Sequence, residues 1–238
     1  VEEPMAESAY GMIFGKGANQ DLRAELNAFL SDNKETVAVL EAKWFSEKEP
    51  TEFMSYDDLN GENGTLRIGV CSSVKPFVYM KDGKLSGYDI EILISFAREY
   101  GYKLDFEDTL FASVLTGVSM GTYDIGASGF CITEERAENV DFSDVYHTEN
   151  LVALIKGTDV GLEQFTNANL GVVTGSLYGG YSRAQFPNAT IKEFNNFAAV
   201  LMALKKGKVD GAMFDRPNFN SFKRDDSGLS CITVPAYS

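Results

Sequence analysis

The sequence predicts an α/β protein with two lobes, each a mainly parallel sheet flanked by helices. From Leu66 onward, short apolar stretches alternate with segments whose apolar residues recur at helical spacing. This alternation is typical of parallel strands covered by helices. The pattern restarts after about residue 156, and 238 residues with 44% hydrophobic content suffice for two compact units. We therefore expect two lobes rather than one large domain.

The expected elements follow from the periodicity of the apolar residues. In the first lobe we expect strands and helices in the order Leu66–Cys71, Asp89–Gly101 (helix), Lys103–Phe106, Phe111–Met120 (helix), Tyr123–Ala127, Glu134–Asn139 (helix) and the extended Leu151–Ile155. In the second lobe we expect the strand Leu170–Val173, a helix opened by Gly175-Ser176, the strand Thr190–Phe194, the helix Phe197–Lys205 and the strand Val209–Phe214. Asp89 is interpreted as the N-cap of its helix.

The first 64 residues do not follow this alternation. Tyr10–Phe14 is predicted as a strand, and Gln20–Leu30 and Lys34–Phe45 as helices. Glu47–Gly64 is polar, contains Pro50 and reads as a linker. Helices are thus expected before the first α/β lobe begins.

Composition excludes several classes of function. Acidic residues outnumber basic ones 35 to 21, and the net charge of −14 disfavours binding to nucleic acids or anionic lipids. No apolar run reaches the length of a membrane span, and Val1–Ala9 does not look like a signal peptide, so an export signal or anchor is expected outside this chain. Three cysteines and a single histidine, His147, disfavour a disulfide-rich scaffold, a structural zinc site and a Ser-His-Asp triad. No cofactor and no metal are expected.

Four fragments, in order, resemble a known family. LRIGVCSSVKPFVYMKDGKLSGYDIEIL, YDIGASGFCITEERAENVDFSD, LGVVTGS and GKVDGAMFDRPN resemble segments of the periplasmic amino-acid-binding proteins of the type II solute-binding class, which serve ABC transporters. The resemblance implies a two-lobed type II fold with two hinge crossings and a small amino-acid ligand. It spans Leu66–Asn218.

The N-terminal segment resembles the same family out of place. YGMIFGKGANQDLRAELNAFL and EAKWF resemble the end of such a protein, where its chain returns to the first lobe. The domain is therefore circularly permuted, or it is cut out of phase from a tandem array. The expected division is 1–46 (completing lobe 1), 47–64 (linker), 65–150 (lobe 1 core), 151–156 (first hinge strand), 157–234 (lobe 2) and 235–238 (second hinge region). A permutation also predicts that Val1 and Ser238 lie near each other.

The resemblance implies roles for residues at the carboxyl ends of the strands, where open α/β sheets bind ligands. Arg136 would clamp the ligand carboxylate, with an exposed helix arginine paired to Glu135 or Glu138 as the alternative. Asp215 would bind the ligand ammonium, with a helix N-cap as the alternative.

Four further positions follow in the same way. Ser128 and Gly129 would offer backbone groups to the ligand, Phe111 would pack against it, and Ser176 would help to bind an anion at a helix start. A core phenylalanine and a plain N-cap serine are the alternatives for the last two.

The sequence also departs from the family pattern. Cys71 stands where many members carry an aspartate, Cys131 where a threonine is usual, and Val74 replaces an aromatic residue. Val173 and Phe214 replace polar residues. These changes fit a neutral or smaller amino acid, or a module that has lost tight binding. Cys71 and Cys131 are either bonded to each other or small buried hydrophobic residues.

The predicted function is an extracytoplasmic, non-enzymatic binding module that delivers a small amino acid to a membrane permease. A ligand-sensing domain of a membrane signalling protein is the alternative, and a small lyase or dehydratase a remote one. The acid–base candidates for the latter are Glu134, Glu135 and His147, and none has a convincing partner.

Overall fold

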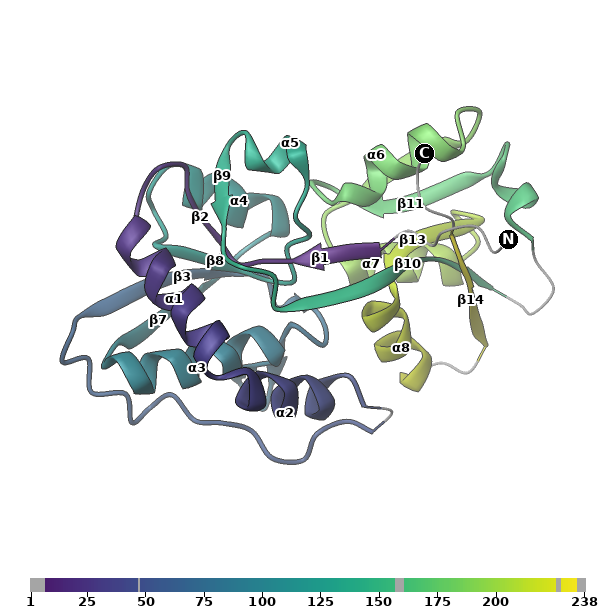
Figure 1. Cartoon of the computed structure of the whole chain (residues 1–238). Helices are drawn as coiled ribbons and strands as arrows, with labels where there is room; N and C mark the ends of the chain where they lie inside the picture. Colours follow the sequence, from purple (N-terminus) through teal and green to yellow (C-terminus); the bar gives the residue numbers. More distant parts are fainter. Residues whose placement is uncertain (1–6, 47, 157–160, 226–227, 235–238) are drawn as a thin grey trace. The chain divides into compact units, whose positions relative to one another are not determined.

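The computed structural model describes residues 7–46, 48–156, 161–225 and 228–234 (Figure 1). The chain divides into a large unit, Ala9–His147, and a small unit formed by Thr148–Ser238 together with Val1–Ser8. The chain crosses between the units twice, at Ser8-Ala9 and at His147-Thr148. The predicted second hinge region, 235–238, lies outside the described residues, as do Val1 and Ser238.

The large unit is built on a five-stranded sheet. Its strand order is β7 (Lys103–Asp108), β3 (Thr65–Val70), β8 (Ile125–Ala127), β2 (Ile13–Gly15) and β9 (Val140–Phe142). β3 runs parallel to β7 and β8, whereas β2 is antiparallel to both of its neighbours. A strand from the first 15 residues therefore lies inside the sheet that the later residues form.

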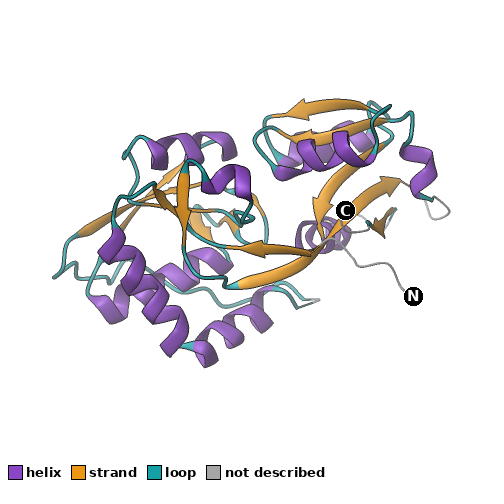
Figure 2. Cartoon of the chain, turned by 45° about the horizontal axis from the view of Figure 1, so that its top comes forward, coloured by secondary structure: helices purple, strands orange, loops and turns teal. Residues whose placement is uncertain are grey.

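Helices and a small second sheet complete the large unit (Figure 2). The helices are α1 (Gln20–Asp32), α2 (Lys34–Trp44), α3 (Tyr88–Tyr100), α4 (Phe111–Ser119) and α5 (Glu134–Ala137). A three-stranded sheet consists of β4 (Ser73–Val74), β5 (Val78–Lys81) and β6 (Lys84–Ser86). Helix α3 is buried over most of its length because apolar residues occur on all sides of it, and α2 packs on it.

The small unit has a six-stranded sheet. The order is β1 (Glu7–Tyr10), β10 (His147–Lys156), β13 (Gly211–Asp215), β11 (Asn169–Val173) and β12 (Thr190–Phe194), and β14 (Leu229–Thr233) also pairs with β10. β11 is parallel to β12 and β13, and β10 is antiparallel to β13 and β14. The helical elements are η1 (Leu162–Phe165), α6 (Leu177–Gln185), α7 (Phe197–Lys205) and α8 (Arg216–Asp225).

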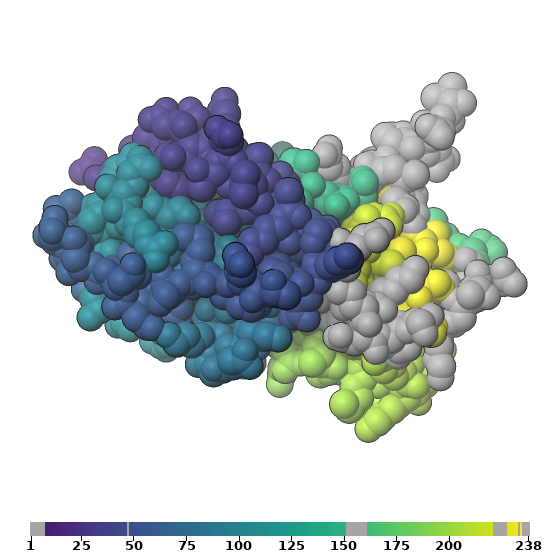
Figure 3. Space-filling view, turned by 90° about the horizontal axis from the view of Figure 1, so that it is seen from below, coloured from purple at the N-terminus to yellow at the C-terminus, as the bar shows by residue number. Residues whose placement is uncertain are grey.

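Residues 46–64 form no regular element where the structure describes them, and they pack on α3. The Met54 amide donates to Glu91 Oε1 over 2.9 Å, and Arg98 Nη2 donates to the carbonyl of Ser55 over 2.7 Å. Figure 3 shows α1, α2 and the following segment, in purple to blue, on one face of the large unit. The predicted linker is therefore part of the packing of the large unit.

Some predicted bounds are wrong, and local hydrogen bonds explain why. The single strand Tyr10–Phe14 is two strands, because the Gly11 amide donates to the carbonyl of Phe130 and the Met12 amide to Ser143 Oγ. The Val209–Phe214 strand begins at Gly211 and ends at Asp215. Asp89 is not an N-cap, because Gly87 holds that position and Asp89 lies in the first turn of α3.

Candidate functional site

Two strand ends of the large unit carry predicted site residues. Cys71 follows β3 and Ser128 follows the neighbouring parallel strand β8, and the Cys71 amide donates to Ser128 Oγ over 2.7 Å. The Ser128 hydroxyl in turn bonds the carbonyl of Ala127. Both residues are buried. The Ser128 side chain therefore fastens the two strand ends to each other.

Cys71 and Cys131 are buried, and no disulfide joins them. Cys71 Sγ lies 3.2 Å from Ser73 Oγ, and burial raises the pKa of the Cys71 thiol above its ordinary value. The backbone carbonyl of Cys131 has a defined role, because it accepts a hydrogen bond from Arg136. The description of these cysteines as small buried hydrophobic residues fits this environment.

Arg136 is buried, with 7% of its surface exposed. Its Nη1 donates to the carbonyl of Cys131 over 2.8 Å, and its guanidinium carbon lies 5.7 Å and 5.6 Å from the ring centroids of Phe111 and Phe130. The two rings stack on each other with centroids 4.5 Å apart. The exposed helix arginine considered as the alternative is therefore wrong. The bond to the carbonyl and the attraction between the guanidinium and the ring faces compensate part of the cost of burying this charge.

Gly129 adopts a left-handed conformation with φ +58°, and its amide donates to Asp89 Oδ2 over 2.8 Å. Asp89 Oδ1 accepts a hydrogen bond from the Tyr146 hydroxyl, also over 2.8 Å. Asp89 is fully buried, and this burial raises its pKa to about 7 against the opposing effect of the two hydrogen bonds. The Gly129 amide, for which the resemblance implies a ligand contact, is thus engaged within the protein.

Val74 completes the predicted residues of the large unit. It is 2% exposed and pairs with Val78 across β4 and β5. Two members of this region were missed by sequence reasoning, Asp89 and Phe130. Asp89 was missed because it was interpreted as an N-cap. Phe130 was missed because a phenylalanine in an apolar segment is equally typical of the core.

The small unit carries Asp215 at the end of β13. Its carboxylate is buried and accepts hydrogen bonds from the Tyr178 hydroxyl over 2.9 Å and from the Asn218 amide and side chain over 2.9 Å and 2.6 Å. A carboxylate that accepts from the amide three residues ahead is an N-cap, here of α8. The N-cap alternative thus describes the local geometry of Asp215, and its role toward a ligand stays a prediction.

Ser176 lies half-buried between β11 and α6. Its hydroxyl donates to the carbonyl of Val173 over 2.6 Å and makes no capping bond to the helix. Val173 and Phe214, both predicted as apolar replacements, are buried in the same unit. The predicted site residues belong to both units: Ser176 and Asp215 to the small unit, and Cys71, Val74, Phe111, Ser128, Gly129, Cys131 and Arg136 to the large unit.

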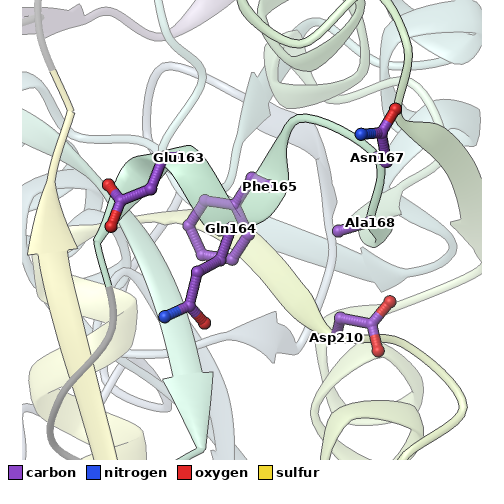
Figure 4. A pocket seen from close by; sticks show the side chains of 6 residues that line it. All are labelled: Glu163, Gln164, Phe165, Asn167, Ala168 and Asp210. Carbon is purple, nitrogen blue, oxygen red and sulfur yellow. The ribbon is translucent and has the colours of Figure 1, made fainter.

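A surface hollow of about 370 Å³ lies elsewhere on the small unit (Figure 4). It is lined by Glu163, Gln164, Phe165, Asn167, Ala168 and Asp210. Asp210 precedes β13 and accepts the amide of Asn169, the first residue of β11. The hollow therefore lies at the amino ends of these strands, opposite the ends that carry the predicted residues.

The acid–base candidates are dispersed. Glu134 and Glu135 are exposed on α5, whereas His147 is buried with its Nδ1 2.6 Å from Glu41 Oε1 and its ring stacked on Phe45. Within the described residues no cluster of three or more His, Cys, Asp or Glu side chains is arranged to hold a metal ion. In the same part of the chain no helix has the length and apolarity needed to cross a membrane.

Comparison with known proteins identifies the relatives of this chain. Residues 66–162 match the model of a family described as bacterial extracellular solute-binding proteins, family 3. A probable histidine-binding protein of Campylobacter jejuni is 27% identical over 168 residues, which cover 69% of this chain and 65% of that relative. The chain thus spans slightly less than two thirds of that relative.

Two solved structures have a similar fold. An amino acid ABC transporter substrate-binding protein from Streptococcus pneumoniae, bound to L-arginine, is 28% identical with a TM-score of 0.69, covering 74% of this chain and 77% of that chain. An ancestral amino acid-binding protein, described as a precursor of cyclohexadienyl dehydratase, is 27% identical with a TM-score of 0.66, covering 74% and 79%. The predicted α/β fold class is confirmed. The chain is related to the bacterial extracellular solute-binding proteins of family 3 and has the type II periplasmic-binding-protein fold of amino-acid-binding proteins.

Proposed function

We propose that this chain is an extracytoplasmic module that binds a small neutral α-amino acid and delivers it to an ABC-type membrane permease. The observation that carries the proposal is the buried Arg136, held by the Cys131 carbonyl and two stacked rings at the carboxyl edge of the large unit's sheet. The planar fork of a guanidinium matches the two oxygens of a carboxylate, so Arg136 is suited to bind the carboxylate of an amino acid.

Asp215 is the proposed partner of the ligand ammonium. It ends β13 in the small unit, at the edge where open α/β sheets bind ligands. Its carboxylate already accepts from Tyr178 and Asn218, which fix its orientation. An ammonium would join or replace one of these donors, so its binding depends on how readily the Tyr178 hydroxyl turns away.

The proposal of a neutral ligand rests on apolar replacements. Val74, Val173 and Phe214 are buried and offer no hydrogen-bonding group to a ligand side chain. The relatives named above are described with histidine and L-arginine. Preference for glutamate, aspartate, lysine or arginine over neutral amino acids would contradict this part of the proposal and leave the binding function intact.

Import is favoured over sensing because the relatives named above are described as binding or transporter proteins. One structural relative is described as the precursor of a dehydratase, so the same fold occurs in enzymes. Function follows from the site and not from the fold, however. When the protein is incubated with a substrate of that enzyme class, the proposal expects no turnover.

The decisive experiment is a thermal-shift screen of the common amino acids followed by calorimetry on variants. A bound amino acid at 100 times its Kd stabilises the folded state by about 2.7 kcal/mol. We expect Arg136→Ala and Asp215→Ala each to weaken binding by about 3–5 kcal/mol, because each leaves an opposite charge buried and unpaired. Arg136→Lys also weakens binding, because an ammonium does not reproduce the fork.

Arg183→Ala is the matched control. This arginine is exposed and pairs with Glu193 on the surface of the small unit, so its removal leaves affinity unchanged. Binding that survives both site substitutions within about threefold would exclude these residues from the site.

We also propose that residues 9–45 supply the helices that the family places at its C-terminal end, as in a permuted or tandem arrangement. Support comes from β2 inside the sheet of the large unit and from α2 packed on α3. Cleavage of an engineered protease site near Pro50 tests this proposal. The fragments should stay associated and folded, and release of the N-terminal fragment would refute it.

A further inference from the structure

We propose that Asp89 is a positioning residue: its buried carboxyl group holds the Gly129 amide and the Tyr146 hydroxyl, and thereby sets the conformation of the segment that leads to Arg136. The two hydrogen bonds to Asp89 do not depend on the proposed function, whereas their effect on affinity rests on the proposed amino-acid binding.

The first step is the position of the segment Ser128–Thr133. It connects the end of β8 to α5, which begins with Thr133 as its N-cap and contains Arg136. One of its anchors is the bond from the Gly129 amide to Asp89 Oδ2. Another is the bond from Arg136 to the Cys131 carbonyl. A displacement at Gly129 is therefore passed to the carbonyl that orients the guanidinium.

The second step is the link from Asp89 to both chain crossings. The same carboxyl group accepts the hydroxyl of Tyr146, which lies one residue before the last residue of the large unit. The Tyr146 amide donates to the carbonyl of Tyr10, and the Gly11 amide donates to the carbonyl of Phe130. Asp89 thus connects the segment before Arg136 with the residues beside both crossings, all within the large unit.

The third step is the chemistry of a carboxyl group that exchanges its proton near neutral pH. Burial raises the pKa of Asp89 to about 7, although hydrogen bonds from Gly129 and Tyr146 oppose the rise. When ionised, Asp89 accepts charge-assisted hydrogen bonds from both donors, which are shorter and stronger than neutral ones. When protonated, it can donate to the Tyr146 oxygen and still accept from Gly129.

Two tyrosines, Tyr88 and Tyr146, are the titratable groups next to Asp89, and the Asp89 charge contributes to the rise of their pKa values. Tyr88 precedes Asp89 in α3 and donates its hydroxyl to the Tyr146 carbonyl. Burial raises the pKa values of Tyr88 and Tyr146 above their ordinary range, so both stay neutral near pH 7. Cys131 also raises the pKa of Tyr146, and Glu41 that of Tyr88. The His147 ring contacts the Tyr88 ring edge-on, with centroids 6.1 Å apart.

The test begins without any ligand. In ¹⁵N-labelled protein the Gly129 amide proton should move downfield as the pH rises through neutrality, because its acceptor becomes charged. In Asp89→Asn this movement should vanish while the fold is kept, since the asparagine oxygen can accept from Gly129 and its amide can donate to the Tyr146 oxygen. A Gly129 amide that does not titrate in the wild type, or that titrates equally in Asp89→Asn, would overturn the proposal.

Affinity is then measured by calorimetry with the common amino acids as probes. We expect Asp89→Ala to weaken the binding of those that bind by about tenfold, because it leaves the Gly129 amide without its acceptor. Asp89→Asn should change it by less than about threefold and remove any pH dependence near neutrality. Tyr146→Phe should shift the midpoint of the Gly129 titration upward, because the ionised form loses a donor.

Glu91→Gln is the matched control. Glu91 is a second buried carboxylate, one half-turn further along α3, and its hydrogen bonds go to Lys43, Trp44 and Met54. This variant should lower stability without moving the amides of Gly129 or Phe130. Equal changes in both variants would show a general loss of structure and refute the positioning role. If Gly129 titrates as expected but no amino acid binds the wild type, the proposed function fails while the Asp89 connection stands.

Discussion

The Glu91 cluster allows a sharp prediction about stability. The Glu91 side chain is 2% exposed, and it accepts hydrogen bonds from Lys43 Nζ at 2.7 Å, from Trp44 Nε1 at 2.9 Å and from the Met54 amide at 2.9 Å. These donors belong to α2 and to the segment after it, whereas Glu91 belongs to α3. One carboxylate therefore attaches the N-terminal helices to the rest of the large unit.

The size of the effect follows from what each substitution leaves behind. Glu91→Ala leaves the buried Trp44 N–H and the Met54 amide without an acceptor, at about 1–3 kcal/mol for each buried group. The Lys43 side chain is 26% exposed, so water replaces part of its lost interaction. We expect Glu91→Ala to lower the free energy of unfolding by about 3–5 kcal/mol. Glu91→Gln, which retains one acceptor oxygen, should lower it by about 2 kcal/mol.

Urea denaturation followed by the fluorescence of Trp44, the single tryptophan, measures this directly. Glu49→Gln is the comparison, because Glu49 forms a surface pair with Lys75 and should contribute less than about 1 kcal/mol. If Glu91→Ala costs less than about 1 kcal/mol, or no more than Glu49→Gln, the cluster does not attach the N-terminal helices.

Three further predictions use single positions. Gly87→Ala should destabilise the fold by more than about 2 kcal/mol in urea denaturation, because its φ is +139° and a Cβ would lie 2.1 Å from the Phe77 carbonyl oxygen. Gly83→Ala is the control: its φ is also positive, but no atom lies within 4 Å of the added Cβ, so it should cost only about 1 kcal/mol. Because the pKa of Asp89 is raised to about 7, the folded state keeps a proton that the unfolded state releases. Stability should therefore fall by up to about 4 kcal/mol as the pH rises from about 4 to 7, relative to Asp89→Asn; no difference in slope would contradict the burial argument. Cys71, whose pKa burial raises, should react with a thiol reagent only on unfolding. Because Cys231 is only partly buried, the modified residue is located by mass spectrometry, and rapid modification of Cys71 in the native protein would contradict its burial.

The sequence predicts the regular part of the fold well. Helix α7 and strand β12 have the predicted bounds, because their apolar periodicity is clear and turn residues flank them. The sheet β4–β6 was missed, although Asp82-Gly83 between β5 and β6 has the positive φ values and the residue pair of a tight hairpin. Helix α8 was missed because it is mostly polar, and its two apolar residues, Phe219 and Phe222, are too few to mark a helix by themselves.

The site was harder to predict because burial of polar groups is a tertiary property. Arg136 and Asp215 could be chosen from motifs, but the sequence gives no sign that the first lies against Phe130 or that the second is held by Tyr178. Asp89 was misassigned because an aspartate before an apolar run usually caps a helix. Here Gly87, with a φ that few other residues adopt, takes the cap position and turns Asp89 inward.

Glu91 and Arg136, two buried charged residues of the large unit, differ in the partners that they have. Glu91 is surrounded by donors from elements that need to be joined, and replacing such a cluster by apolar residues can preserve stability. Arg136, in helix α5, instead has its guanidinium against two aromatic rings and donates to the carbonyl of Cys131, and the proposed amino-acid binding uses this group. Measuring stability and affinity on the same variants therefore distinguishes the two residues. Glu91 variants should lower stability alone, whereas Arg136 variants should mainly lower affinity.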